Sequence, residues 1–111
     1  MSDYIASFFG VAMLSESGFQ FKLIKRLQHM FPDCFIIRTG ASDNQGVPDI
    51  LILWGDRWAM LECKKSASSR IRPNQQYFVD MFNGMSFAAF IWPEIEEEVL
   101  YALQQSFDFN R

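Results

Sequence analysis

The stretch GVPDILILWGDRWAMLECKK, residues 46–65, is the feature that most constrains how this chain can fold. It holds two apolar runs of β-type residues around Gly55-Asp56, a dipeptide that suits a two-residue hairpin turn. A turn at that dipeptide fixes which residues of the two strands face each other. The predicted pairs are Trp54–Arg57, Leu53–Trp58, Leu51–Met60 and Asp49–Glu62. Because the strands are apolar on both faces, we expect a sheet that is covered on each side.

Two carboxylates and one lysine lie within this apolar region. If Asp49 faces Glu62, their Cβ atoms are about 4.5–5.5 Å apart. Lys64 follows Glu62 by two residues and therefore shares its face of the strand, whereas Cys63 points to the other side. Two like charges this close repel each other, and burial disfavours both ionised forms. A core strand would not carry these groups without a compensating interaction.

Three arrangements relieve the repulsion between the two acids. They share a proton, they form a structural ion pair with Lys64 or Arg38, or they bind a divalent cation. Oxygen ligands from two strands suit Mg²⁺ or Mn²⁺, and magnesium keeps coordination positions for water and substrate phosphate. A neighbouring ammonium stabilises charge on that phosphate, so the set is typical of metal-assisted phosphodiester hydrolysis. His29, the single histidine, is expected at the surface or boundary of the first helix.

The rest of the chain predicts an α/β domain in the order helix, three strands, helix, strand, helix. Ser15 can cap the first helix, after which apolar residues recur at helical spacing. Pro73 suits the first turn of the second helix, and Gly84 is expected to end it. The acidic run 94–98 is interpreted as a solvated helix start. The predicted ranges are helix 15–31, strand 34–39, loop 40–46, the hairpin, loop 66–72, helix 73–83, strand 86–92 and helix 94–106.

Composition limits the class of protein. The chain has 111 residues, half of them hydrophobic, which is enough for one domain with its own core over residues 1–111. Its two cysteines form no CxxC pair, so we expect neither a structural zinc nor a disulfide framework, and a cytoplasmic location. Residues 1–14 lack a basic flank and the length of a membrane span, so neither a signal peptide nor a transmembrane helix is predicted. They are interpreted as a short helix, a strand, or an arm that packs on a partner.

The motif around the hairpin resembles that of a known nuclease superfamily. PD at residues 48–49 and ECK at residues 62–64, on facing strands after a helix that bears an acid, resemble the PD-(D/E)xK motif. GVPDILIL and MLECKKSASSRIRPNQQYFVDMFNG are similar to its VRR-NUC branch, in which a loop, a Pro-x-Gln helix start and a glycine follow the lysine strand. The resemblance runs from about Glu16 to Leu103. It implies a restriction-endonuclease-like core, α-β-β-β-α-β-α, with a small mixed sheet flanked by helices.

The resemblance implies a role for each residue of the motif. Asp49 and Glu62 would be ligands of a Mg²⁺ or Mn²⁺ cofactor, and the backbone carbonyl of Cys63 would be another ligand. Lys64 would be the catalytic lysine. Glu16 matches the acid of the first helix, which lies near the metal directly or through a water molecule.

Residues after the lysine strand would complete the site. Gln75 matches a glutamine that shapes the site, with Gln76 as the alternative if the register slips by one. The net charge of −3 is a departure, because tight autonomous DNA binding favours a basic protein. The predicted nucleic-acid contacts are Arg70, Arg72, Lys65 and Arg38.

The function expected from the motif is a metal-dependent DNA endonuclease, with flap, branched or Holliday-junction-like DNA as the finer expectation. Short standalone chains of this kind resemble homodimeric junction resolvases, and compact nucleases of this type are common in phages, acting in the host cytoplasm. The alternative is a non-catalytic module with a nuclease fold, or a subunit that needs a partner to supply DNA affinity. The acidic net charge favours this alternative. The converged Asp49, Glu62 and Lys64 favour the enzyme.

Overall fold

A computed structural model describes residues 15–40 and 44–109 of the chain, so the expectations for residues 1–14 lie outside the described part. The elements follow the predicted order, with one added 3₁₀ turn before the last helix. In the described part of the chain, the fold is an α/β domain in which three helices flank a four-stranded mixed sheet. The elements are α2 (Glu16–Met30), β1 (Phe35–Arg38), β2 (Ile50–Trp54), β3 (Arg57–Cys63), α3 (Pro73–Met85), β4 (Phe87–Ile91), η1 (Pro93–Ile95) and α4 (Glu96–Phe109).

The sheet has the order β1-β2-β3-β4. The first three strands pair antiparallel, and β4 pairs parallel to β3 after a crossover through α3. The hairpin register is confirmed, with Trp54 opposite Arg57 and Leu51 opposite Met60. The paired ladder ends at Ile50 and Leu61. The predicted Asp49–Glu62 pair therefore lies one step beyond the regular strand pairing, at the end of the sheet away from the hairpin turn.

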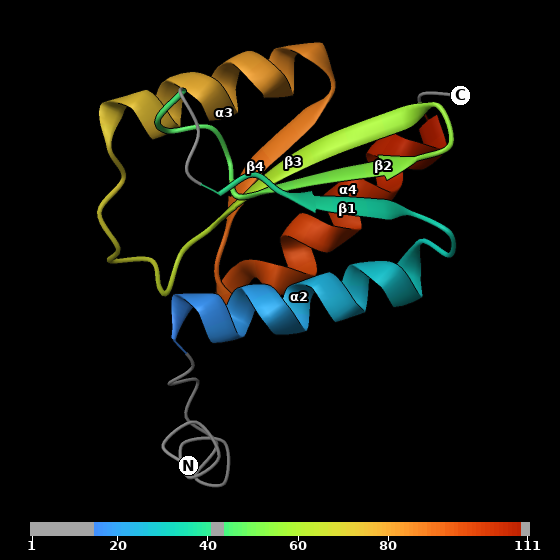
Figure 1. The fold of residues 1–111 in the computed structure, drawn as a ribbon, viewed down its shortest axis with the longest axis horizontal. Helices are drawn as coiled ribbons and strands as arrows, with labels where there is room; N and C mark the ends of the chain where they lie inside the picture. Colours follow the sequence, from blue (N-terminus) through green and yellow to red (C-terminus); the bar gives the residue numbers. More distant parts are fainter. Residues whose placement is uncertain (1–14, 41–43, 110–111) are drawn as a thin grey trace, which may run out of the picture.

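The helices cover both faces of the sheet, but unevenly (Figure 1). On one face α2 and α4 pack against the strands and form the main core; its members are Phe19, Leu23, Leu27, Phe31, Ile50, Ile52, Ala59, Leu61, Cys63, Ile91, Leu100, Leu103 and Phe107. On the other face α3 packs on β3 and β4 around Met60, Val79 and Ala88. The expected cover on each side is therefore incomplete, because Phe35 and Leu53 stay exposed on the α3 face, at 64% and 37%.

The first helix begins as predicted, because the N–H of Gly18 donates to the Ser15 hydroxyl at 3.0 Å. The predicted end of α3 at Gly84 is wrong by two residues. The helix continues through that glycine to Met85, and the N–H of Ser86 donates to the carbonyl of Phe82. Since Gly84 is not among the glycines with positive φ, it keeps ordinary helical geometry and does not end the helix.

The acidic run 94–98 is not wholly solvated, which corrects the expectation from the sequence. The guanidinium of Arg26 on α2 contacts Glu96 at 2.6 Å and Glu97 at 2.8 Å. The side chain of Glu96 is only 22% exposed. The ion pairs of Arg26 join α2 to α4, the two helices that cover the same face of the sheet. No helix within residues 15–40 and 44–109 is both long enough and apolar enough to cross a membrane.

We expect Leu27→Ala to lower the free energy of unfolding by about 2–4 kcal/mol, because Leu27 is fully buried in the main core. Leu53→Ala is the matched control, since it removes the same atoms from a side chain that is 37% exposed. It should cost about 1 kcal/mol or less. Urea unfolding followed by circular dichroism measures both. Equal losses in the two variants would contradict the placement of the core beneath α2.

Candidate active site

Most of the predicted site residues, Lys65, Arg38 and Cys63 excepted, meet in one cavity of about 560 Å³ at the end of the sheet where β3 stops. The N-termini of α2 and α3 lie at this same end (Figure 1). The loop before β2 and the loop between β3 and α3 complete the walls. The cavity is lined by Glu16, Gly40, Asn44, Gln45, Gly46, Val47, Asp49, Glu62, Lys64, Arg70, Arg72, Asn74 and Gln75.

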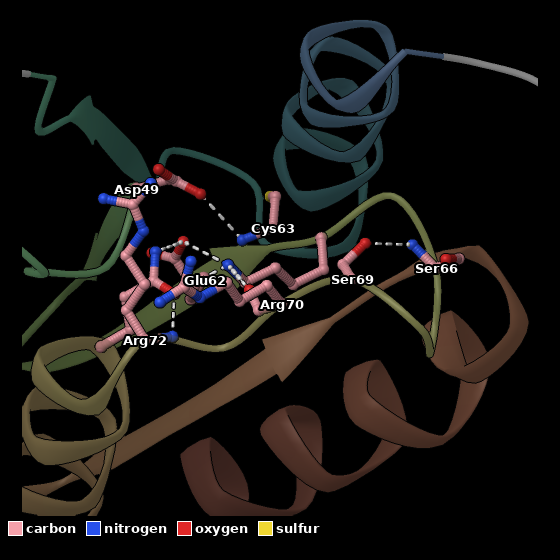
Figure 2. A network of polar contacts seen from close by, with 9 residues as sticks. Asp49, Glu62, Cys63, Ser66, Ser69, Arg70 and Arg72 are labelled. Carbon is pink, nitrogen blue, oxygen red and sulfur yellow. Dashed lines mark hydrogen bonds and ion pairs between the residues drawn. The ribbon is translucent and has the colours of Figure 1, made fainter.

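Asp49 is held where the chain enters β2. The N–H of Thr39 donates to the Asp49 carbonyl at 2.9 Å, and the Thr39 hydroxyl donates to the Pro48 carbonyl at 2.8 Å. Oδ2 of Asp49 accepts a hydrogen bond from the backbone N–H of Cys63 at 2.9 Å (Figure 2). The carboxylate thus gives a partner to the backbone N–H of Cys63, which lies just beyond the end of the β2–β3 pairing. Burial raises the pKa of Asp49, while the bond from Cys63 and the charge of Lys64 act to lower it.

Glu62 and Lys64 project from the end of β3 and are almost completely buried, at 4% and 7% exposure. The backbone N–H of Lys64 donates to the carbonyl of Ile91 at 2.8 Å, which continues the pairing with β4. Its ammonium donates to the carbonyl of Arg70 at 3.0 Å and to Oε1 of Gln75 at 2.8 Å. The ammonium lies 3.9 Å from Oε2 of Glu62. Lys64 therefore holds a fixed position between the loop, α3 and the glutamate.

A single amide, that of Gln75, contacts both charged groups. Its Nε2 donates to Oε2 of Glu62 at 3.3 Å, while its Oε1 accepts from Lys64 and from the backbone N–H of Arg72. The bond from Arg72, at 3.0 Å, gives a partner to the backbone N–H of the residue that precedes α3. Gln76, the alternative, bonds to Asp80 on its own helix and does not line the cavity. The glutamine at the site is Gln75.

The carboxylates of the cavity disfavour one another's ionisation. Burial, with added repulsion from Asp49 and Glu16, raises the pKa of Glu62 to about 8, and Lys64 only partly offsets this. Burial and the charge of Asp49 also raise the pKa of Glu16. Protons or a bound cation would remove this repulsion. Three ionised carboxylates in this cavity would therefore destabilise the folded protein unless a proton or a cation were bound.

The residues fit a magnesium or manganese ion. Within residues 15–40 and 44–109, no three His, Cys, Asp or Glu side chains form a ready-made cluster that could hold a metal. Mg²⁺ does not need one, because it typically binds through one or two carboxylates with water and substrate phosphate. Asp49 and Glu62 supply such a pair, and the backbone of Cys63 lies against Asp49. The Cys63 thiol is buried on the core side and its pKa is raised by burial, so it is not a candidate ligand.

The four predicted nucleic-acid contacts do not lie together. Arg70 and Arg72 line the cavity, and Figure 2 shows the Arg72 side chain extending toward Asp49. Lys65 is exposed but does not line the cavity. Arg38 also lies outside the lining, where its Nε donates to Gln20 at 2.8 Å, although its charge lowers the pKa of Asp49.

One wall of the cavity is not predicted by the sequence. Asn44, Gln45 and Gly46 form part of the cavity together with Asn74 from the first turn of α3. From the sequence alone, residues 40–46 indicate only a loop rich in turn-forming residues. No short-range pattern links Gly46 to Asn74, which lies far along the chain, so no signal in the sequence could have found the contact.

We expect Glu62→Gln to stabilise the metal-free protein at pH 8–9, by roughly 1–3 kcal/mol, because it removes a buried charge beside two other acids. Glu62 binds its proton more tightly in the folded chain, where its pKa is about 8, than in the unfolded chain, where it is 4.5. Its stabilising contribution is therefore complete below pH 4.5 and is lost as the pH rises to about 8.

Urea unfolding of both proteins with EDTA, between pH 4.5 and 9, measures this difference, and Glu98→Gln on the exposed side of α4 is the control. The gap between wild type and Glu62→Gln should widen with pH. A constant gap would contradict the raised pKa.

Family models, curated proteins and solved structures were all compared with this chain, and none of them matches it. The resemblance to PD-(D/E)xK nucleases therefore rests on the motif residues themselves.

Proposed function

We propose that this chain is a Mg²⁺- or Mn²⁺-dependent endonuclease that hydrolyses phosphodiester bonds in DNA, with a restriction-endonuclease-like core of the VRR-NUC type. The observation that carries the proposal is the Glu62–Gln75–Lys64 unit, in which the half-buried Gln75 joins two buried charged groups and which shares one polar cavity with Asp49. A carboxylate and an ammonium buried together are costly to desolvate. Their convergence on a second carboxylate is best accounted for by chemistry that uses all of them.

The metal would be held by Asp49 and Glu62, with the backbone carbonyl of Cys63 as a further ligand and Glu16 in contact through water. A bound divalent ion supplies a Lewis acid for the phosphate and lowers the pKa of a bound water molecule. Lys64 uses two of its three N–H groups on Arg70 and Gln75, which leaves one for the substrate. That N–H would stabilise the charge that develops on the scissile phosphate.

The arginines on the cavity wall would position the DNA backbone. Arg70 and Arg72 both line the cavity that holds the carboxylates. Phosphate contacts of this kind fix register and orientation without reading sequence. Lys65 and Arg38, which lie outside the cavity lining, would contact more distant phosphates.

The finer expectations from the resemblance belong to the same proposal. They are selectivity for flap, branched or Holliday-junction-like DNA, a homodimer, a phage origin and action in the cytoplasm. The exposed apolar side chains of β1 and β2, Phe35, Ile37 and Leu53, supply surface for a dimer contact. Two copies would place two sites on the two strands of a branched substrate.

The second candidate is a non-catalytic DNA-binding module, or a subunit that depends on a partner for DNA affinity. The net charge of −3 is the observation that favours it. A module freed from catalysis has no physical need to keep Asp49, Glu62 and Lys64 converged. The two candidates differ in whether a bound substrate is cut.

We expect Lys64→Ala and Glu62→Gln each to lower DNA cleavage by at least about 100-fold, because each removes a group that acts on the transition state. Supercoiled plasmid, a flap and a four-way junction are incubated at low salt with Mn²⁺, Mg²⁺ or EDTA. Lys22→Ala, an exposed lysine of α2 that does not line the cavity, is the matched control and should cut like wild type. Substrates that stay intact but shift in a gel would favour the non-catalytic module.

We expect Arg72→Ala to weaken DNA binding about equally on all sequences and to reduce the slope of log affinity against log salt by about one. The substitution keeps the backbone N–H that orients Gln75, so the effect should come from the lost guanidinium. Fluorescence anisotropy with Ca²⁺, across a series of salt concentrations, measures both quantities. Lys25→Ala, an exposed lysine outside the cavity lining, is the control. An unchanged salt slope would contradict a phosphate contact by Arg72.

A further inference from the structure

The turn at residues 44–47 is fastened to the first turn of α3. Nδ2 of Asn74 donates to the backbone carbonyl of Gln45 at 3.1 Å. Gly46 has φ +96°, and a Cβ placed on it would lie 2.8 Å from Cγ and 2.9 Å from the carbonyl carbon of Asn74. Only a glycine allows the backbone to approach so closely in this conformation. We name the contact among Gln45, Gly46 and Asn74 the latch.

The latch joins two segments that carry site residues. Asp49 follows Gly46 by three residues, and Gln75 follows Asn74 directly. The other side of Asp49 is already held by Thr39 on the β1 side. The approach to Asp49 is therefore fixed from two directions, by β1 and by α3.

We infer that Asn74 and Gly46 are positioning residues, which set Asp49 relative to the Glu62–Gln75–Lys64 unit. Asn74 lines the cavity and is exposed, so its hydrogen bond to Gln45 adds little to the core. Its effect is on geometry, because the bond ties the turn before Asp49 to the helix that orients Glu62 and Lys64. The consequence for metal binding rests on the proposed function, whereas the position of Asp49 does not.

The amide proton of Cys63 reports directly on the position of Asp49, because it donates to Oδ2 of that residue. Its hydrogen-exchange rate is measured by NMR in the metal-free protein. We expect Asn74→Ala and Gly46→Ala to speed its exchange at least about threefold, with Asp49→Ala giving the rate without the acceptor. Gln76→Ala is the matched control, since it lies in the same helical turn and bonds to Asp80 instead. It should leave the Cys63 amide unchanged.

Asn74→Asp separates positioning from stability. It keeps the shape of the side chain and places an acid in the first turn of α3, where it favours the helix. It nevertheless replaces the N–H donor of the latch with an oxygen. The inferred role predicts fast Cys63 exchange without a loss of melting temperature. A merely structural role predicts that exchange and melting temperature change together.

Calorimetric titration with Mn²⁺ tests the consequence for the site. We expect Asn74→Ala to raise the dissociation constant for Mn²⁺ by about 3–10-fold, and Gly46→Ala to raise it by about tenfold or more. Losses of this size are typical when a group that orients metal ligands is removed. Gln76→Ala should bind Mn²⁺ like wild type. A wild-type protein that binds no Mn²⁺ would count against the proposed function, while the Cys63 amide would still decide the positioning role. Unchanged Cys63 exchange in both Asn74→Ala and Asn74→Asp would overturn the inference.

Discussion

The burial of Glu62 and Lys64 beside each other at the end of β3 is the constraint on which the rest of the site depends. Each group loses its hydration, and their separation of 3.9 Å is too long for a direct hydrogen bond. Gln75 resolves the mismatch, because its amide accepts from the ammonium and donates to the carboxylate. Its orientation is fixed in turn by the backbone at Arg72. The start of α3 and the end of β3 therefore cannot shift independently without leaving a buried charge without partners.

The regular part of the fold was predictable because its signals are local. The Gly55-Asp56 turn fixes the hairpin register, and Gly55 has the positive φ that such a turn requires. Once that register is known, Asp49 and Glu62 must lie near each other at the far end of the two strands. The Ser15 cap is equally local, since it is made to a backbone group three residues away. The proximity of Asp49, Glu62 and Lys64 thus follows from one turn and from the way side chains alternate between the two faces of a strand.

The rest was not predictable because it depends on contacts between distant segments. The α3 helix continues past Gly84, because this glycine keeps helical geometry and does not adopt the positive φ that ends many helices. The acids of α4 found a partner in Arg26 on α2, which no pattern in either segment indicates. Arg70 and Arg72 reach the cavity, while Lys65 does not. The sequence of this segment does not indicate which of its basic residues point into the cavity.

The net charge of the chain says little about the potential at the cavity. Its lining carries three acidic side chains, Glu16, Asp49 and Glu62, and three basic ones, Lys64, Arg70 and Arg72. Burial and the neighbouring acids raise the pKa of Glu62 to about 8, which favours its protonated form in the absence of a cation. Binding of a divalent ion would therefore release a proton and still leave the cavity more positive than before. Attraction for phosphate would then increase when the metal binds. On the proposed function, DNA would therefore be favoured at this cavity in the metal-bound form, despite the acidic net charge of the chain.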